Sequence, residues 1–374
     1  MMSNSMNEWF EINDLDTLDS PALVFYPARI AENIEKLKSS IDHVDRLRPH
    51  VKTHKSADIT TLMLNAGISK FKCATIAEAE MLAQCGATNV LLAYQPVGPK
   101  ITRYAELISR YPSTSFSCLF DHANSIKMLS EVGRKAAQPV NVFLDLNIGM
   151  NRTGITSGDQ ALRLYLAAST IEGINMLGLH GYDGHIHKPS LQKRREEWQA
   201  GWDAIRNLSE QIVAAGLPRP RIIAGGTPTF PFYAEESEVE CSPGTFILWD
   251  KGYQDSFKEQ EYLIAAMVLT RVVSLPSQTT ITVDLGHKAV AAENELTKRV
   301  YFINAPNARV VSQSEEHLVL EMGADHGLQI GDVLYALPKH ICPTVALYER
   351  AAIVKDNQIM GEWKISSRDR KINI

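Results

Sequence analysis

The stretch FKCATIAEAEMLAQCGATNVLLAY (residues 71–94) contains two short apolar runs separated by a helical segment. FKCA (71–74) and NVLLAY (89–94) are predicted to be buried strands, and IAEAEMLAQCG between them is predicted to be a helix. Two strands joined through a helix lie parallel in one sheet, because the crossover brings the chain back to the same edge. The stretch therefore predicts a parallel α/β sheet.

The same alternation extends in both directions, from about residue 22 to about residue 250. The other predicted strands are ALVFY (22–26), RLRPHVK (46–52), SFSCLF (115–120), NVFLDLN (141–147), MLGLHGY (176–182), RIIAGG (221–226) and CSPGTFIL (241–248). A closed (β/α)8 barrel needs eight of these nine strands, which leaves the first free to belong to another sheet. An open doubly wound sheet is the alternative, but no G-x-G-x-x-G follows a strand, so a dinucleotide site of that kind is not expected.

The pattern changes after about residue 255. Segments such as TTITVDL, HLVLEM and DVLYALP are β-rich and separated by turns, with no long helix. This pattern predicts an antiparallel domain. We therefore expect a (β/α)8 barrel over residues 20–255 and a β domain over residues 256–374, together with roughly residues 1–19.

Composition narrows the classes of function. The chain has 374 residues, which fits two domains, and its net charge of -5 argues against a general nucleic-acid binder. The sequence contains no run of 18 or more apolar residues, so no membrane span is predicted. The polar, acidic start lacks the features of a signal peptide, so a cytoplasmic location is expected. Five widely spaced cysteines argue against a disulfide framework.

Lys52 is the first candidate for chemistry. It closes a predicted strand in RPHVKTHK, beside Arg48, His50 and His54. Catalytic residues of a (β/α)8 barrel lie at the C-terminal ends of the strands. Positive neighbours and partial burial favour the neutral amine of a lysine, which can then form an imine. The simpler interpretation is a solvated lysine in a basic loop.

Two glycine turns follow late strands of the predicted barrel. Small residues at these positions let backbone N–H groups approach a phosphate, and late βα loops are the usual phosphate site of this barrel. A phosphate and an imine-forming lysine in one barrel mouth are what pyridoxal phosphate requires, although each turn alone is also compatible with an ordinary loop. The predicted phosphate-binding residues are Gly225, Gly226, Thr227, Gly244 and Thr245.

Two short histidine motifs suggest metal chemistry. In PKHICPT, His340 and Cys342 lie two residues apart. On a strand such residues face the same side, so an imidazole and a thiolate could hold a soft divalent metal, most naturally zinc. H-x-C alone is common by chance, and a structural histidine beside a buried cysteine is the simpler interpretation of the motif taken by itself. The pair His185 and His187 resembles the metal motif of barrel hydrolases, but it follows a late strand instead of the first, so we do not assign it to a metal. Tyr182, just before it, can stack on a cofactor ring.

These motifs, in this order, resemble the D-threonine aldolase and D-serine dehydratase family, whose fold is that of alanine racemase. The resemblance covers nearly the whole chain from residue 18 to about 350, and its most specific parts are RPHVKTHK and the late H-x-C. It implies a pyridoxal 5′-phosphate enzyme, a divalent metal (zinc, or manganese or magnesium) and a small D-amino acid substrate. It also implies a head-to-tail homodimer in which the β domain of one chain helps to close the barrel of the other.

The resemblance further implies roles for particular residues. Lys52 would carry the cofactor, with Arg152 of NRTG and Tyr182 near the cofactor ring or its substituents. His340 and Cys342 would bind the metal, with Glu315 of SEEH close by. His185 or a metal-bound water would be the catalytic base of an aldolase.

Two features divide the family into two reactions. H-x-C with zinc is the dehydratase pattern, whereas GLHGYDGH looks more like the proteins grouped with the aldolases. The first hypothesis is an aldolase-type lyase that cleaves a 3-hydroxy D-amino acid such as D-threonine into glycine and an aldehyde. The alternative is a dehydratase for D-serine or 3-hydroxy-D-aspartate that releases a keto acid and ammonia. An amino-acid racemase and a non-enzymatic carrier of the cofactor are further alternatives, the latter disfavoured by the second domain.

Overall fold

A computed structural model describes residues 8–374, which divide into two compact units that interleave along the chain. The barrel unit comprises residues 35–52, 59–246 and 366–374, and the β unit comprises residues 8–34, 53–58 and 247–365. The domains predicted from the sequence, residues 20–255 and 256–374, differ from this division in the first and last segments of the described chain. Residues 8–34 lie in the β unit, and residues 366–374 lie in the barrel unit.

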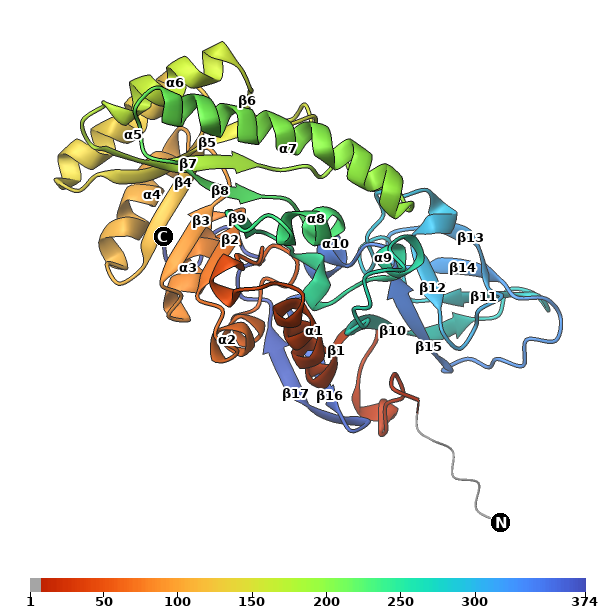
Figure 1. The fold of residues 1–374 in the computed structure, drawn as a ribbon. Helices are drawn as coiled ribbons and strands as arrows, with labels where there is room; N and C mark the ends of the chain where they lie inside the picture. The colour runs from red at the N-terminus through yellow and green to blue at the C-terminus, as the bar shows by residue number, and fades with distance from the viewer. Residues whose placement is uncertain (1–7) are drawn as a thin grey trace. The chain divides into compact units, whose positions relative to one another are not determined.

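The barrel unit is built on a parallel sheet with the strand order β2-β3-β4-β5-β7-β8-β9, and β6 pairs with β5. The strands are β2 (Lys70–Cys73), β3 (Asn89–Leu92), β4 (Ser115–Phe120), β5 (Val140–Asn147), β6 (Ile155–Thr156), β7 (Ile174–Gly181), β8 (Arg221–Ala224) and β9 (Val239–Cys241). Six of them match the six predicted strands from FKCA to RIIAGG. The prediction for CSPGTFIL (241–248) is wrong beyond its first residue: β9 ends at Cys241, because Pro243 has no N–H to donate, and Thr245–Ile247 forms a 3-10 helix. Figure 1 shows helices along the outer side of this sheet, as the strand–helix alternation predicts.

Residues 47–52 close the sheet between its two edge strands. Leu47 bridges Cys241 of β9, and His50 bridges Lys72 of β2, both in parallel orientation. Backbone bonds support the closure: His50 N–H donates to the Pro243 carbonyl at 2.9 Å. Pro49 has no N–H to donate, which explains isolated bridges instead of a regular strand. The parallel strands and this closing segment together form the barrel, so the (β/α)8 fold prediction is confirmed, although residues 47–52 form bridges instead of a regular strand.

The helices of the chain are short to medium in length, apart from α7. They are α1 (Pro27–Ser39), α2 (Ala57–Asn65), α3 (Ile76–Gln84), α4 (Pro99–Arg110), α5 (Ala123–Ala136), α6 (Asp159–Ser169), α7 (Leu191–Ala214), α8 (Phe230–Ala234), α9 (Lys251–Ser256) and α10 (Ile341–Val345). Caps fix several helix starts: the Thr75 hydroxyl accepts the Glu78 N–H at 3.1 Å at the start of α3. No helix within residues 8–374 combines the length and the apolarity that a membrane crossing needs.

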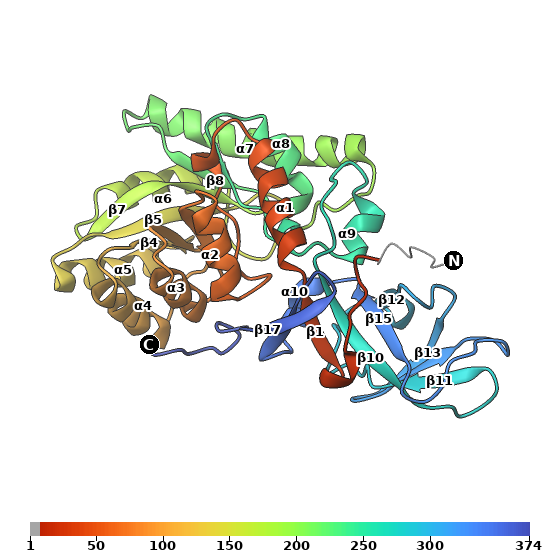
Figure 2. The ribbon, with the colours of Figure 1, turned by 90° about the horizontal axis from the view of Figure 1, so that it is seen from below.

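The β unit contains the predicted second sheet, which is mostly antiparallel. Its strands are β1 (Ala22–Phe25), β10 (Ala266–Ser274), β11 (Thr280–Val283), β12 (Val300–Phe302), β13 (Arg309–Gln313), β14 (Leu318–Glu321), β15 (Val333–Pro338), β16 (Arg350–Lys355) and β17 (Gln358–Lys364). The first predicted strand, β1, belongs here, because it pairs with β10 and β16. Figure 2 shows β1 running beside β10.

The interior of the barrel is filled in layers. An apolar layer consists of Leu91, Leu119, Phe143 and Ile223, all at most 2% exposed. Asp145 follows Phe143 by two residues on β5 and therefore faces the same interior. Interior side chains at the level of Asp145 lie between the apolar layer and the C-terminal ends of the strands, where the catalytic residues of such barrels are found.

A buried ion pair joins the edge strands β2 and β9 with the closing segment. Arg48, 2% exposed, binds Glu240 at 2.7 Å, and Lys70 binds the other carboxylate oxygen at 2.8 Å. Replacing Arg48 by methionine leaves a buried carboxylate with one partner, so we expect the free energy of unfolding to fall by about 3 kcal/mol. Denaturant titration measures this loss, with the exposed Lys127→Met as control. Equal stability of the two variants would contradict the prediction.

Candidate functional site

Three cationic side chains converge on the ring of Tyr182 in the barrel unit. The Nζ atoms of Lys52 and Lys72 lie 5.2 Å and 5.4 Å from the ring centroid, and the guanidinium carbon of Arg152 lies 5.1 Å from it. The sequence predicted Lys52, Arg152 and Tyr182 for one site, and the structure brings them together. Lys72, on β2, was not predicted.

Two glycines allow the ring of Tyr182 to occupy its position. A Cβ atom on Gly184 would lie 2.5 Å from the ring, and one on Gly226 would lie 3.3 Å from it. Gly226 belongs to the GGT turn after β8, so this predicted phosphate turn packs against the same ring. The turn and the cation cluster are therefore parts of one site.

The loop that carries Arg152 is held by side chains of neighbouring strand ends. The Asn147 amide oxygen accepts the N–H groups of Gly149 and Asn151 at 3.2 Å and 3.0 Å. Asp121 accepts the Gly154 N–H at 2.9 Å. Gly154 has a φ of +93°, and a Cβ there would lie 2.5 Å from backbone, so only glycine fits. These bonds fix Arg152 relative to β4 and β5.

The two predicted phosphate turns are joined by the hydroxyl of Thr227. This oxygen accepts the N–H of Gly244 at 2.9 Å and the N–H of Thr245 at 3.0 Å. Gly225 has a φ of +78°, and a Cβ there would lie 2.5 Å from the Tyr233 ring. The structure thus places all five predicted residues around one small region of backbone N–H groups at the ends of β8 and β9.

A buried pair of Asp145 and His180 adjoins the cation cluster and was missed by the sequence analysis. The two residues face each other in the β5–β7 register, and His180 Nδ1 lies 2.7 Å from the Asp145 carboxylate. Because the carboxylate only accepts, Nδ1 carries the proton and Nε2 is left as an acceptor in the neutral ring. Burial, with Lys72 adding to it, lowers the pKa of His180 to about 4. His180 Nε2 is buried and has no partner in residues 8–374.

Lys72 is the least expected member of the group. Its side chain is buried, and its Nζ has no hydrogen-bond partner within the described residues. Burial, followed by the charge of Lys52, lowers the pKa of Lys72 to about 7. The only sequence signal was the alternation of Lys70 and Lys72 in a strand that was predicted to be buried.

His185 lies against the loop that carries Arg152. A Cβ on Gly149 would lie 2.6 Å from His185 Nε2, which shows how closely the imidazole approaches that backbone. Burial lowers the pKa of His185, so the neutral ring is favoured, as a general base requires. His187 is exposed on the same segment.

His340 and Cys342 lie together in the β unit, although not on a strand as expected. β15 ends at Pro338, His340 is the N-cap of α10, and Cys342 lies in the first turn. Pro343 favours this helix start, because the first turn needs no N–H at that position. The helix start still brings the imidazole and the thiol within hydrogen-bonding contact.

Further groups of the β unit surround this pair. His340 Nδ1 lies 2.5 Å from the Glu293 carboxylate, and the Thr53 hydroxyl lies 3.2 Å from Cys342 Sγ. Asp250 accepts the Ile341 N–H at 3.1 Å and so anchors the start of α10. Glu315, which the resemblance placed nearby, forms an ion pair with Lys288 at 2.6 Å. In residues 8–374 no cluster of three or more His, Cys, Asp or Glu side chains is arranged to hold a metal.

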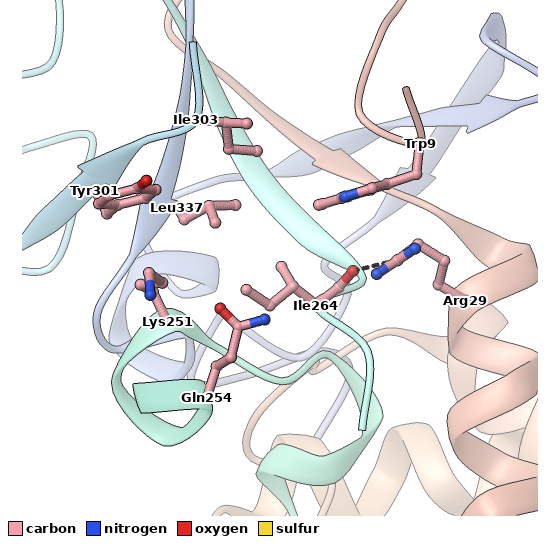
Figure 3. Close-up of a pocket in the computed structure, with 8 residues that line it drawn as sticks. All are labelled: Trp9, Arg29, Lys251, Gln254, Ile264, Tyr301, Ile303 and Leu337. Atoms are coloured by element: carbon pink, nitrogen blue, oxygen red, sulfur yellow. Dashed lines mark hydrogen bonds between the residues drawn. The ribbon is translucent and has the colours of Figure 1, made fainter. Parts of the chain in front are cut away.

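A surface pocket in the β unit, of about 240 Å³, lies among other residues (Figure 3). Its two cations already have partners: Arg29 stacks on Trp9 at 4.0 Å and donates to the Ile264 carbonyl at 2.6 Å, and Lys251 binds Asp255. The pocket is lined by Trp9, Arg29, Lys251, Gln254, Ile264, Tyr301, Ile303 and Leu337. None of these residues belongs to the predicted site, and we assign no chemistry to the pocket.

The barrel site fits a phosphorylated, anionic cofactor with an aldehyde. A lysine amine and two more cations surround one aromatic ring, and the glycine turn after β8 packs against the same ring. The buried and unpartnered Lys72 Nζ and His180 Nε2 show that the polar groups of the protein are not satisfied by one another. An anionic oxygen of a ligand can accept from Lys72 Nζ, and a ligand hydroxyl or N–H can donate to His180 Nε2; pyridoxal phosphate carries anionic oxygens and therefore fits the cations of the site.

Comparison with known families supports the fold and shows the family. Residues 27–250 match the family model described as alanine racemase, N-terminal domain, and residues 265–354 match a putative serine dehydratase domain. The second match includes His340 and Cys342. The crystal structure of D-threonine aldolase from Filomicrobium marinum superposes with a TM-score of 0.86 at 26% identity, covering 96% of this chain and 98% of that one.

Curated relatives are similar over nearly their whole length. D-threonine aldolase from Arthrobacter sp is 25% identical over 95% of this chain and 94% of its own. 3-Hydroxy-D-aspartate aldolase from Paracoccus denitrificans (strain Pd 1222) is 26% identical over 96% and 94%. D-threo-3-hydroxyaspartate dehydratase from Delftia sp. (strain HT23) is 25% identical over 93% and 97%. Both reactions considered from the sequence thus occur among the relatives.

Proposed function

Because the chain belongs to the alanine racemase N-terminal domain family, we propose that it is a pyridoxal-phosphate-dependent lyase that cleaves a 3-hydroxy D-amino acid into glycine and an aldehyde. The observation that carries this proposal is the convergence of Lys52, Arg152 and Tyr182 beside the glycine turns. The second match, to a dehydratase domain, covers the β unit that a simple carrier of the cofactor does not need.

In the proposed reaction the barrel residues hold the cofactor and orient the substrate. The amine of Lys52 would hold the cofactor covalently, and Arg152 and Tyr182 would position its ring. The Thr227 hydroxyl, which accepts from Gly244 and Thr245 and can still donate its own proton, would bind the phosphate together with the turns that carry these residues. When bound, pyridoxal phosphate supplies an electron sink for the bonds at the substrate Cα atom.

Cleavage of the Cα–Cβ bond also needs a base for the proton of the 3-hydroxyl group. We assign this role to His185, because its imidazole, for which the neutral form is favoured, lies against the loop that carries Arg152. His340 and Cys342 would hold a divalent metal, zinc by the softness of the thiolate, with manganese or magnesium as alternatives. Such a metal supplies Lewis-acid activation of the hydroxyl oxygen.

Dehydration of D-serine or 3-hydroxy-D-aspartate is the second candidate, and Cys342 favours it. A thiolate ligand selects zinc, the metal of the dehydratase pattern in the sequence comparison. In this reaction Lys52 takes the Cα proton and the hydroxyl leaves as water; hydrolysis of the released enamine then gives a keto acid and ammonia. We propose a homodimer for either activity, which the family resemblance supports, and a cytoplasmic location, which remains an expectation from the sequence.

Product analysis separates the candidates. The purified holoenzyme is incubated with D-threonine, 3-hydroxy-D-aspartate and D-serine, with the L-enantiomers as controls. Glycine and an aldehyde are expected for the first function, and a keto acid with ammonia for the second. Activity that survives exhaustive chelation and yields only the opposite enantiomer would contradict both and indicate a racemase.

A further inference from the structure

Lys72 differs from its neighbour on the same strand in one decisive respect. Lys70, which faces the same side of β2, forms an ion pair with Glu240 at 2.8 Å. Lys72 is 2% exposed and its Nζ has no hydrogen-bond partner in the part of the chain that the structure describes. A buried cation without a partner costs free energy, so a folded protein retains one only where something else compensates.

The carboxylates around Lys72 do not satisfy it. Asp145 is engaged by His180 at 2.7 Å and by Gln95 at 2.9 Å. Asp183 accepts the Thr229 hydroxyl at 3.0 Å. The other charged neighbours, Lys52 and Arg152, are positive like Lys72 itself. Both carboxylates act on the charge of Lys72 from a distance, and Asp183 Oδ2 is itself without a partner, but neither carboxylate hydrogen-bonds to Lys72 Nζ, which therefore lacks a directly bound anion in the described residues.

We propose that Lys72 is an oxyanion-binding residue of the cofactor site, which pairs with a negatively charged oxygen of the ligand that lies against Tyr182. The inference rests on the proposed function, because it needs an anionic ligand in this barrel. Two sources share the required chemistry: an oxygen of the cofactor, or a carboxylate of the amino acid substrate. Lys72 then acts beside Lys52 and Arg152 as a third fixed cation.

The variants Lys72→Met and Lys72→Arg test the inference, with Lys70→Met as matched control. Methionine keeps most of the length of lysine without its charge, so cofactor-free Lys72→Met is expected to melt at a higher temperature than the wild type. The same variant is expected to bind pyridoxal phosphate about tenfold or more weakly, whereas Lys72→Arg retains part of the affinity. Lys70→Met is expected to lose stability and to keep its cofactor affinity.

The two sources of the oxyanion give different results. Weaker cofactor binding by Lys72→Met, measured without substrate, identifies an oxygen of the cofactor. Unchanged cofactor affinity with a KM for the D-amino acid about tenfold higher or more identifies the substrate carboxylate. If cofactor affinity and KM both equal the wild-type values, or if cofactor-free Lys72→Met is less stable, the inference is overturned. A wild type that binds no cofactor refutes the proposed function itself, and the inference with it.

The stability difference must also depend on pH in a defined direction. The pKa of Lys72 falls from 10.5 to about 7 on folding, mainly through burial. Between these values the unfolded chain binds more protons, so the stability of the cofactor-free wild type rises with pH. A methionine side chain does not titrate, so the excess stability of Lys72→Met is expected to be largest below pH 7 and to shrink toward pH 10. An excess that is constant over this range would overturn the assignment of Lys72 as a buried, unpaired cation.

Discussion

Replacing Lys52 by alanine is expected to abolish turnover, with a loss on the order of 10³-fold or more in kcat, because the residue both anchors the cofactor and moves protons. The visible absorption band of a lysine-bound cofactor should disappear in this variant. In the wild type, borohydride should bleach the band and leave the cofactor fixed to the peptide that contains Lys52. Spectra before and after borohydride, followed by peptide mass analysis, measure both effects.

The borohydride experiment needs a control for Lys72, a second lysine that could be fixed to the cofactor. It lies against the same ring as Lys52, 5.4 Å from the Tyr182 centroid, and its pKa of about 7 leaves part of its amine neutral at physiological pH. Reduction of the double variant Lys52→Ala, Lys72→Met tests whether any residual fixation comes from Lys72. Cofactor fixed to a lysine outside the barrel, or undiminished turnover by Lys52→Ala, would refute the assigned role of Lys52.

The alternation of apolar runs and helical segments was sufficient to predict the barrel, because every strand of such a barrel buries apolar side chains and is followed by a helix. The pattern was less informative for the first strand. ALVFY is as apolar as a barrel strand, and only its pairing with β10 and β16 shows that it belongs to the other sheet. Pairing partners depend on residues more than two hundred positions away, and no local pattern contains them.

Site residues that belong to a sequence motif were predicted, whereas site residues that meet only in the folded structure were missed. Lys52 and Arg152 lie in recognisable segments, whereas Asp145 and His180 meet only through the register of β5 with β7. Lys72 was hidden for a different reason. A lysine in an apolar strand predicts an exposed side chain, and its burial follows only from the curvature that closes the barrel over it.

His340 and Cys342 lie side by side as predicted, but the reason given for it was wrong. Residues i and i+2 share a face on a strand, but His340 and Cys342 approach each other because one caps a helix and the other lies in its first turn. The neighbours differ as well, since Glu293 rather than Glu315 contacts the imidazole. Carboxylates that reach a site from a distant loop leave no spacing signal in the sequence.

His340→Ala and Cys342→Ala are expected to lower kcat/KM by about 10²- to 10³-fold each, if the pair holds a metal that activates the substrate hydroxyl. Removing either ligand leaves one protein donor, which is too few to retain a divalent ion in competition with a chelator. Metal content by mass spectrometry should therefore fall in parallel with activity. The exposed His287, in the same unit, provides the control His287→Ala, for which neither quantity should change.

Two further variants, Glu293→Gln and Cys342→Asp, test the metal site more specifically. Glu293 holds His340 through a 2.5 Å contact, so Glu293→Gln is expected to reduce metal affinity about 10- to 100-fold while the protein remains folded. Cys342→Asp replaces a soft ligand by a hard one, so the metal that best restores activity should change from zinc to manganese or magnesium. Cofactor absorbance should stay as in the wild type in all of these variants, because the barrel residues are untouched. Full activity of His340→Ala after chelation would refute a metal at this pair and leave the base on the substrate hydroxyl as the only activating group.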